Sequence, residues 1–240
     1  MRDVKIKKYN KKFDYTYAFG MFPTIELLTT KPSKAIKVLL NTHSARSVEL
    51  ERIIYLCKKN GVRFEFNNRQ IEKIAVKENT YAIGIFEKFG STLSETNNHI
   101  ALVNPSDMGN VGTIIRTMLG FGISDMAMIR PAIDIFDPRV VRSSMGGFFK
   151  INFEYFDSFE DYMDRFETHN LYSFMLDAKS ELHKVKFNAP FSMIFGNEGD
   201  GLPESYKNIG ESVHIKHNDK IDSLNLSVAV GIALYESLNA

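Results

Sequence analysis

Three short stretches of this chain place glycine and polar side chains directly before or after an apolar run. In the first, residues 104–110 read Asn-Pro-Ser-Asp-Met-Gly-Asn and lead into an apolar segment that contains a single charge, Arg116. Glycine here allows the backbone to approach a ligand closely, and the arginine should lean back toward Asn110 at the start of the helix. A plain helix cap with a solvent-facing arginine is the alternative interpretation. Opposite Arg116, four apolar residues at helical spacing predict a buried stripe: Val111, Ile114, Ile115 and Met118.

The second stretch is a loop with three glycines, Gly196, Gly199 and Gly201, that also carries Glu198 and Asp200. The spacing is wrong for a phosphate-binding P-loop, no lysine follows, and the two carboxylates would repel phosphate. The loop is therefore better suited to a neutral or cationic ligand held by backbone groups, or it is simply a tight connection between a strand and a helix.

The third stretch, residues 216–225, ends with Ser223 and Asn225 at the mouth of the last predicted helix. Either side chain could simply cap that helix. His214 and His217 lie three residues apart near the end of a predicted strand, but no cysteine or carboxylate pattern joins them, so no metal site is predicted.

Short apolar strands alternate with helices through most of the chain. This alternation predicts an α/β fold with a mostly parallel sheet covered on both faces. Ligands in such sheets bind beyond the carboxyl ends of the strands, which is where the three polar turns are expected. The first half is predicted to hold strands 35–41, 62–66 and 81–89 and a helix over 47–61; the second half is predicted to hold strands 99–103, 126–131, 171–176, 191–196 and 212–216 and helices over 109–122, 157–170, 203–210 and 223–238.

Charge divides the 240-residue chain into a basic and an acidic half. Residues 1–90 carry 18 lysines and arginines against 9 acidic residues, and residues 91–240 carry 12 against 20. The small, polar segment 91–97 is interpreted as a linker, so the predicted domains are 1–90 and 98–240. A basic half attracts phosphate backbones, although a solvated lysine-rich surface fits equally well. The candidates for contact with a phosphate backbone at the N-terminus are Lys5, Lys7, Lys8, Lys11 and Lys12.

Composition indicates a cytoplasmic protein. Cys57 is the single cysteine, which excludes an internal disulfide and fits a reducing compartment. No apolar stretch approaches the roughly 20 residues that span a bilayer, so no membrane association is expected. A nicotinamide-dependent oxidoreductase is disfavoured because Asp107 stands where the dinucleotide fingerprint needs its first glycine.

In this order and spacing, the three stretches resemble the three motifs of the SpoU/TrmH family, which are RNA ribose 2′-O-methyltransferases of the SPOUT superfamily. The resemblance covers residues 99–240 and includes the segment Val-Val-Arg-Ser-Ser-Met-Gly-Gly at 140–147. The first half is similar, less sharply, to the small ribosomal-protein-like substrate-binding domain of many members. Two departures are Glu78-Asn79 in place of a usual His-Gln, and Ile215-Lys216-His217 in place of Ile-Pro-Met.

The resemblance implies a sheet with a deep trefoil knot, a homodimer, S-adenosylmethionine as cofactor and RNA as substrate. Ribosomal RNA is favoured over tRNA, because the N-terminal domain is of the kind found on rRNA-modifying members. The open alternatives are an RNA-binding protein with a non-catalytic SPOUT fold, and a SPOUT enzyme that methylates tRNA or a base.

The resemblance also implies roles for individual residues. Asn110, Ser223 and Asn225 would position ribose and cofactor, Glu198 would brace its loop, and Gly196, Ile215 and Leu224 would line the cofactor pocket, largely through backbone. The preferred role for Arg116 is to clamp the adjacent phosphate and polarise the hydroxyl, since free arginine is almost never deprotonated. General-base catalysis by Arg116 is the other role considered within the family.

Overall fold

The computed structural model describes residues 4–43, 47–75 and 80–238, and it separates into two compact units. Unit 1 comprises residues 1–89 and 134–150, and unit 2 comprises residues 90–133 and 151–240. The sequence places residues 134–150 in the second predicted domain, whereas in the structure they pack with the first. The rest of the predicted division stays a prediction, and Glu78-Asn79 lie outside the described residues.

Unit 1 is a four-stranded sheet in the order β1-β4-β2-β3, with β4 antiparallel to its neighbours β1 and β2. The predicted strands and helix of the first half appear as β2, β3, β4 and α2, whereas β1, α1 and α3 had no clear sequence pattern. Ser47 caps α2 through Leu50 N, and Gly61 ends it at a φ of 67°. Its elements are β1 (Tyr15–Phe19), α1 (Met21–Thr30), η1 (Pro32–Lys34), β2 (Ala35–Leu40), α2 (Val48–Asn60), β3 (Arg63–Phe66), α3 (Asn68–Ile74) and β4 (Ala82–Glu87).

The described part of the N-terminal segment packs on this unit. Val4, Ile6, Tyr9 and Phe13 lie against the cluster formed by β1, β4 and α3, and the Tyr15 hydroxyl donates to the Lys5 carbonyl at 2.7 Å. The lysines between these apolar residues are exposed. The segment therefore presents an ordered row of positive charge.

Residues 134–150 join unit 1 through aromatic and polar contacts. They contain α5 (Pro138–Ser143) and η2 (Gly147–Lys150). The Thr16 hydroxyl donates to the Phe136 carbonyl at 2.7 Å, the Phe149 ring lies 4.9 Å from that of Phe86, and Lys150 pairs with Glu26 at 2.8 Å. Periodicity gave no signal for this association, because it depends on contacts between residues more than 50 positions apart.

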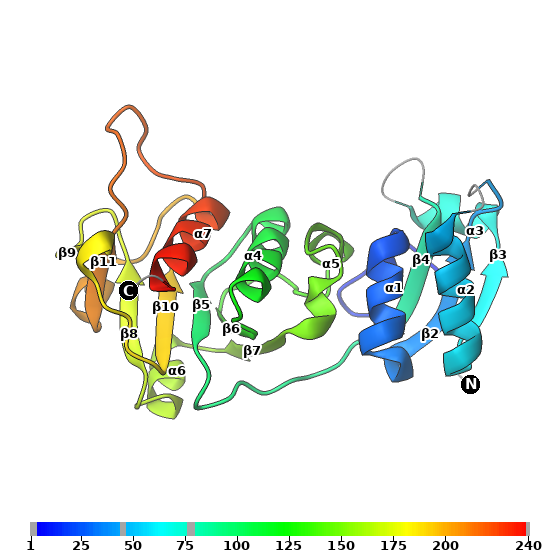
Figure 1. Ribbon diagram of the computed structural model, residues 1–240, viewed down its shortest axis with the longest axis horizontal. Coiled ribbons are helices and arrows are strands. Elements are labelled where there is room, and N and C mark those ends of the chain that lie inside the picture. Colours follow the sequence, from blue (N-terminus) through cyan, green and yellow to red (C-terminus); the bar gives the residue numbers. More distant parts are fainter. Residues whose placement is uncertain (1–3, 44–46, 76–79, 239–240) are drawn as a thin grey trace. The chain divides into compact units, whose positions relative to one another are not determined.

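Unit 2 is a seven-stranded sheet in the order β7-β6-β5-β10-β8-β11-β9, and its strand pairings are parallel (Figure 1). The predicted parallel sheet is confirmed, and the trefoil knot stays a prediction. The sequence missed β7 and the short β9. Its elements are β5 (His99–Val103), α4 (Met108–Gly120), β6 (Asp125–Ile129), β7 (Asn152–Phe156), α6 (Phe159–Arg165), β8 (Asn170–Phe174), β9 (Ser180–Glu181), η3 (Leu182–Lys184), β10 (Phe191–Phe195), η4 (Glu204–Asn208), β11 (Glu211–His214) and α7 (Leu226–Ser237).

Helices cover both faces of this sheet. Ala101, Ala127 and Ile194 face α6, whose Phe159 and Tyr162 belong to the same buried cluster. Because side chains alternate along a strand, Ile100, Leu102 and Met126 must face the other side, where α4 packs against α7 (Figure 1). Within the described residues, no helix combines the length and apolar character that crossing a membrane requires.

The predicted linker contains no helix or strand, but it is packed against unit 2. Leu93 is 4% exposed, and the buried Asp125 carboxylate accepts hydrogen bonds from Ser94 N at 3.0 Å and Asn97 Nδ2 at 3.0 Å. A buried carboxylate needs such donors, so the small polar residues of the predicted linker are held against unit 2.

Candidate active site

The three polar turns meet at the carboxyl edge of the unit 2 sheet. The first turn follows β5, the second follows β10, and the third connects β11 to α7. β5 and β10 are neighbours, and α4 packs against α7, so the helices that begin after the first and third turns lie side by side. The sheet topology therefore unites residues more than 100 positions apart.

The first turn presents Asn110 and Arg116 on α4. Asn104 opens the turn at a φ of 52°, a left-handed conformation that asparagine tolerates better than most residues, and Asp107 caps α4 by accepting from Asn110 N at 2.7 Å. The predicted apolar stripe is buried, and Arg116 is exposed on the outer side of the helix. Arg116 makes no hydrogen bond or ion pair with any residue that the structure describes.

The second turn doubles back so tightly that position 196 must be glycine. A Cβ atom on Gly196 would lie 2.1 Å from the backbone carbon of Gly201. Asn197 and Gly201 exchange two backbone hydrogen bonds of 3.1 and 3.0 Å. The Asn197 side chain donates to the Asn104 carbonyl at 2.8 Å, which attaches the second turn to the first.

Glu198 makes the second connection between these turns. Its carboxylate accepts from the Ser106 hydroxyl at 2.7 Å and from the backbone N–H groups of Ser106 and Asp107 at 3.1 Å each. Burial by itself would raise the pKa of Glu198, but these hydrogen bonds to the charged form outweigh burial and lower the pKa. Glu198 is therefore a bracing anion and not a proton donor at neutral pH.

A chain of side-chain amides extends this connection to the third turn. Asn225 Nδ2 donates to Asn110 Oδ1 at 3.1 Å, and Asn110 Nδ2 donates to Glu198 Oε1 at 3.4 Å. Because an ionised carboxylate can only accept, Glu198 fixes the direction of both amides. Asn225 also caps α7, since its Oδ1 accepts from Ser227 N at 3.0 Å. We call this series, Asn225 to Asn110 to Glu198, the amide relay.

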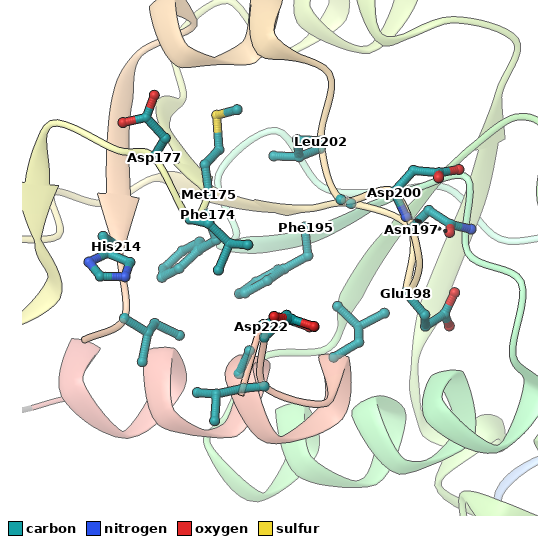
Figure 2. A pocket seen from close by; sticks show the side chains of 18 of the residues that line it. Phe174, Met175, Asp177, Phe195, Asn197, Glu198, Asp200, Leu202, His214 and Asp222 are labelled. Carbon is teal, nitrogen blue, oxygen red and sulfur yellow. Dashed lines mark hydrogen bonds between the residues drawn. The ribbon is translucent and has the colours of Figure 1, made fainter. Parts of the chain in front are cut away.

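Next to the relay lies a cavity of about 430 Å³, lined by the second turn, the third turn and the end of β8 (Figure 2). Its floor contains the stacked rings of Phe174 and Phe195, whose centroids are 4.4 Å apart. Among the described residues that line its wall are five carboxylates and one lysine, Lys207, which is paired with Asp177. The other four are Glu198, Asp200, Glu204 and Asp222.

A model of the SpoU rRNA Methylase family matches residues 97–235. The chain belongs to this family.

Named relatives agree with this membership. The 23S rRNA (guanosine-2′-O-)-methyltransferase RlmB of Acinetobacter baylyi is 25% identical over 92% of this chain and 96% of its own length. An uncharacterized tRNA/rRNA methyltransferase of Synechocystis is 30% identical over 58% of this chain, and the match spans 52% of that protein. The crystal structure of an AdoMet-bound rRNA methyltransferase from Sinorhizobium meliloti superposes with a TM-score of 0.79 at 27% identity, covering 94% of this chain and 87% of that one.

The structure brings all the predicted site residues of this SpoU family member to one edge of unit 2. Five of them line the cavity: Gly196, Glu198, Ile215, Ser223 and Leu224. Asn110 and Asn225 lie in the relay, and Arg116 lies six residues further along α4 than Asn110. Their assignment to individual roles stays a prediction.

Sequence reasoning missed several residues of the site. Ser106 and Asn197 hold the first two turns together, and Phe174 and Asp177 line the cavity from the end of β8. The end of β8 carries no glycine-rich motif. The one sequence signal for a site there is that these residues follow the predicted strand 171–176, because ligands bind beyond the carboxyl ends of parallel strands.

Two imidazoles lie where β11 leads into the third turn. His214 and His217 both line the cavity, with ring centroids 5.8 Å apart, and His217 Nδ1 is 2.9 Å from the Ile215 carbonyl. His217 thus replaces the family's usual methionine with a side chain that hydrogen-bonds to the turn itself.

Proposed function

We propose that this chain transfers the methyl group of S-adenosylmethionine to a ribose 2′-hydroxyl of ribosomal RNA. The observation that carries the proposal is the amide relay, which connects all three turns beside an acidic cavity while Arg116 on the same helix as Asn110 stays unpaired among the described residues.

The cavity suits S-adenosylmethionine, which supplies a methyl group on a positively charged sulfur. Its volume lies in the range of small-molecule sites, and its aromatic floor can cover an adenine ring. The excess of carboxylates favours a cationic ligand, and the tight turn at Gly196 forms part of the cavity wall. Gly196, Ile215 and Leu224 are the proposed cofactor contacts.

Arg116 is proposed to hold the RNA. A hydroxyl is a poor nucleophile unless its proton is polarised or removed, and a guanidinium next to it can bind the adjacent phosphate bidentately. Proton removal by Arg116 is disfavoured, because an exposed guanidinium does not deprotonate. Asn110, Ser223 and Asn225 would fix the ribose and cofactor in line, which is the main requirement of a displacement reaction.

Ribosomal RNA is favoured as the substrate by the extent of the relatives' similarity. RlmB and the Sinorhizobium meliloti protein, both named as rRNA enzymes, are similar over more than nine-tenths of the chain and so include unit 1. Unit 1 supplies positive charge in the exposed lysines at positions 5, 7, 8, 11 and 12, which suits a phosphate backbone.

A homodimer is proposed from the outer face of α7. Val228, Ile232 and Tyr235 recur at helical spacing and are 49%, 38% and 60% exposed. An apolar stripe of this kind on a surface helix typically packs against a partner.

A cytoplasmic location is proposed from the single cysteine, Cys57. Its thiol is buried, and burial raises its pKa to about 11.

The test is methyl transfer from S-adenosylmethionine to ribosomal RNA prepared from cells lacking the gene. Nuclease-resistant 2′-O-methyl dinucleotides in the digest would identify ribose methylation and separate it from base methylation. Arg116→Ala should lower kcat/KM by roughly 10²–10³, as removal of one preorganised donor does, with cofactor affinity unchanged. Cofactor binding without transfer to any RNA would support a non-catalytic fold instead.

A further inference from the structure

Three neighbouring strands of unit 2 end at the same level beside the first turn. Val103 pairs with Ile129 in register, and Ile129 pairs with Phe156. Hydrogen bonding continues one residue beyond the strands, from Asn104 N to the Ile129 carbonyl at 3.1 Å and from Arg130 N to the Phe156 carbonyl at 3.0 Å. Since adjacent strands lie roughly 4.8 Å apart, Arg130 is the next backbone position beside the first turn.

The Arg130 side chain is held over an aromatic ring. Its guanidinium carbon lies 4.8 Å from the centroid of the Tyr155 ring, and its Nε lies 3.0 Å from Asp157 Oδ1. The side chain of Arg130 is 52% exposed and that of Asp157 is 90% exposed. One face of the guanidinium is therefore covered by the ring, and the group as a whole stays accessible to solvent.

Hydrogen bonds connect the Tyr155 ring to the first turn. The Tyr155 hydroxyl donates to the Ile133 carbonyl at 2.8 Å, and Ile133 N donates to the Pro105 carbonyl at 3.2 Å. Pro105 directly precedes Ser106, whose backbone N–H and hydroxyl hold Glu198. An ordinary surface ion pair has no such connection, so the Arg130 position is fixed relative to the amide relay.

This arrangement is suited to a phosphate of an RNA strand that passes the active site. A guanidinium binds phosphate strongly, and stacking on an aromatic ring orients it in advance. The carboxylate of Asp157 occupies one donor, but an exposed ion pair of this kind is weak and can exchange for a phosphate at little cost.

We propose that Arg130, stacked on Tyr155, binds the phosphate of a nucleotide beside the one that is methylated, and that Asp157 competes with this phosphate for the guanidinium. The inference rests on the proposed function, because it needs an RNA strand at the first turn. It adds a contact for RNA on the side of the first turn opposite the cofactor cavity, where β6 and β7 end.

The experiment measures initial rates of methyl transfer with saturating S-adenosylmethionine and varied ribosomal RNA from cells lacking the gene, at two salt concentrations. Arg130→Ala should raise the KM for RNA about five- to tenfold, with kcat and cofactor Kd nearly unchanged. The KM for RNA should also depend less steeply on salt, by the amount expected for the loss of about one phosphate contact. Asp157→Asn should act in the opposite direction and lower the KM by about two- to fivefold, because the competing carboxylate is absent. The double variant should behave like Arg130→Ala alone.

Arg165→Ala is the matched control. Arg165 also pairs with a carboxylate, Glu154 at 2.5 Å, and also lies over aromatic rings, among them that of Phe156. Since Tyr155 and Phe156 are successive residues of β7 and face opposite sides of the sheet, Arg165 lies on the other side from Arg130. It should leave the KM for RNA unchanged. Wild-type salt dependence in Arg130→Ala, or weaker RNA binding in Asp157→Asn, would overturn the inference. If the wild-type protein itself transfers no methyl group to RNA, the proposed function fails instead.

Discussion

The direction of the amide relay leads to a prediction about Glu198→Gln, a change that keeps the size of the side chain. The glutamine retains one oxygen, which should stay with Ser106, where the carboxylate now makes its shortest hydrogen bond of 2.7 Å. Its new NH₂ group then faces two donors, Asp107 N and Asn110 Nδ2. If the Asn110 amide turns so that its Oδ1 accepts from the glutamine, its Nδ2 then faces Asn225 Nδ2, and two donors oppose each other. The variant must leave at least one hydrogen bond of the relay broken.

The size of the effect follows from the strength of these hydrogen bonds. A hydrogen bond to a charged group contributes about 1.5–3 kcal/mol and a neutral one about 1 kcal/mol. Glu198 and its partners are partly exposed, so water should recover roughly half of this sum. We therefore expect transition-state stabilisation to fall by about 1.5–2 kcal/mol, which is roughly 10- to 30-fold in kcat/KM for methyl transfer.

A second substitution should reverse the relay. In Glu198→Gln, Asn225→Asp the glutamine can donate to a turned Asn110, and Asn110 Nδ2 can donate to the new carboxylate, which still caps α7 through Ser227. Asn225→Asp alone should be impaired, because it places an acceptor against Asn110 Oδ1. The double variant should then be more active than the product of the two single effects predicts, by about 1.5 kcal/mol in a double-mutant cycle.

The assay is steady-state kcat/KM for all four proteins, with cofactor Kd as a check that the cavity is intact. Additive effects in the cycle would refute the relay, since they would mean that the three side chains do not act through one another. Full activity of Glu198→Gln would show that the carboxylate does not fix the direction of the Asn110 amide.

Three further results are expected. Leu224→Arg should abolish S-adenosylmethionine binding in calorimetry without unfolding the protein, because Leu224 lines the cavity, and tight binding would show that the cofactor lies elsewhere. Burial lowers the pKa of His99 from 6.5 to about 4, so between these pH values the unfolded chain binds a proton that the folded chain does not. The free energy of unfolding, measured with denaturant, should therefore fall by about 3 kcal/mol as the pH is lowered from 6.5 to 4. An unfolding free energy that stays constant over this range would contradict the prediction. Ile232→Glu should convert the proposed dimer to a monomer in sedimentation, whereas Tyr55→Glu, at a 61% exposed position of unit 1, should not.

Periodicity and turn chemistry in the sequence predicted the strands, helices and turns that carry the predicted site residues. The stripe from Val111 to Met118 predicted α4 because a 3.6-residue repeat of apolar side chains can be buried only on one face of a helix. A tight connection was one interpretation of the glycines in the second turn, and the structure shows such a turn, because a Cβ atom on Gly196 would lie 2.1 Å from the backbone carbon of Gly201. The alternation of strands and helices predicted a parallel sheet, and the motifs carried the family resemblance that the comparisons confirm.

The tertiary structure alone decided which distant residues meet. Nothing local distinguishes Asn225 as a helix cap from Asn225 as a relay donor, and it is both because β11 and α7 bring it to Asn110. Likewise, the polar residues of 91–97 have the composition of a flexible linker, but buried Asp125 fixes them. Sequence patterns report the periodicity of one segment at a time, whereas these contacts depend on strand order, and strand order is set by the packing of the whole sheet.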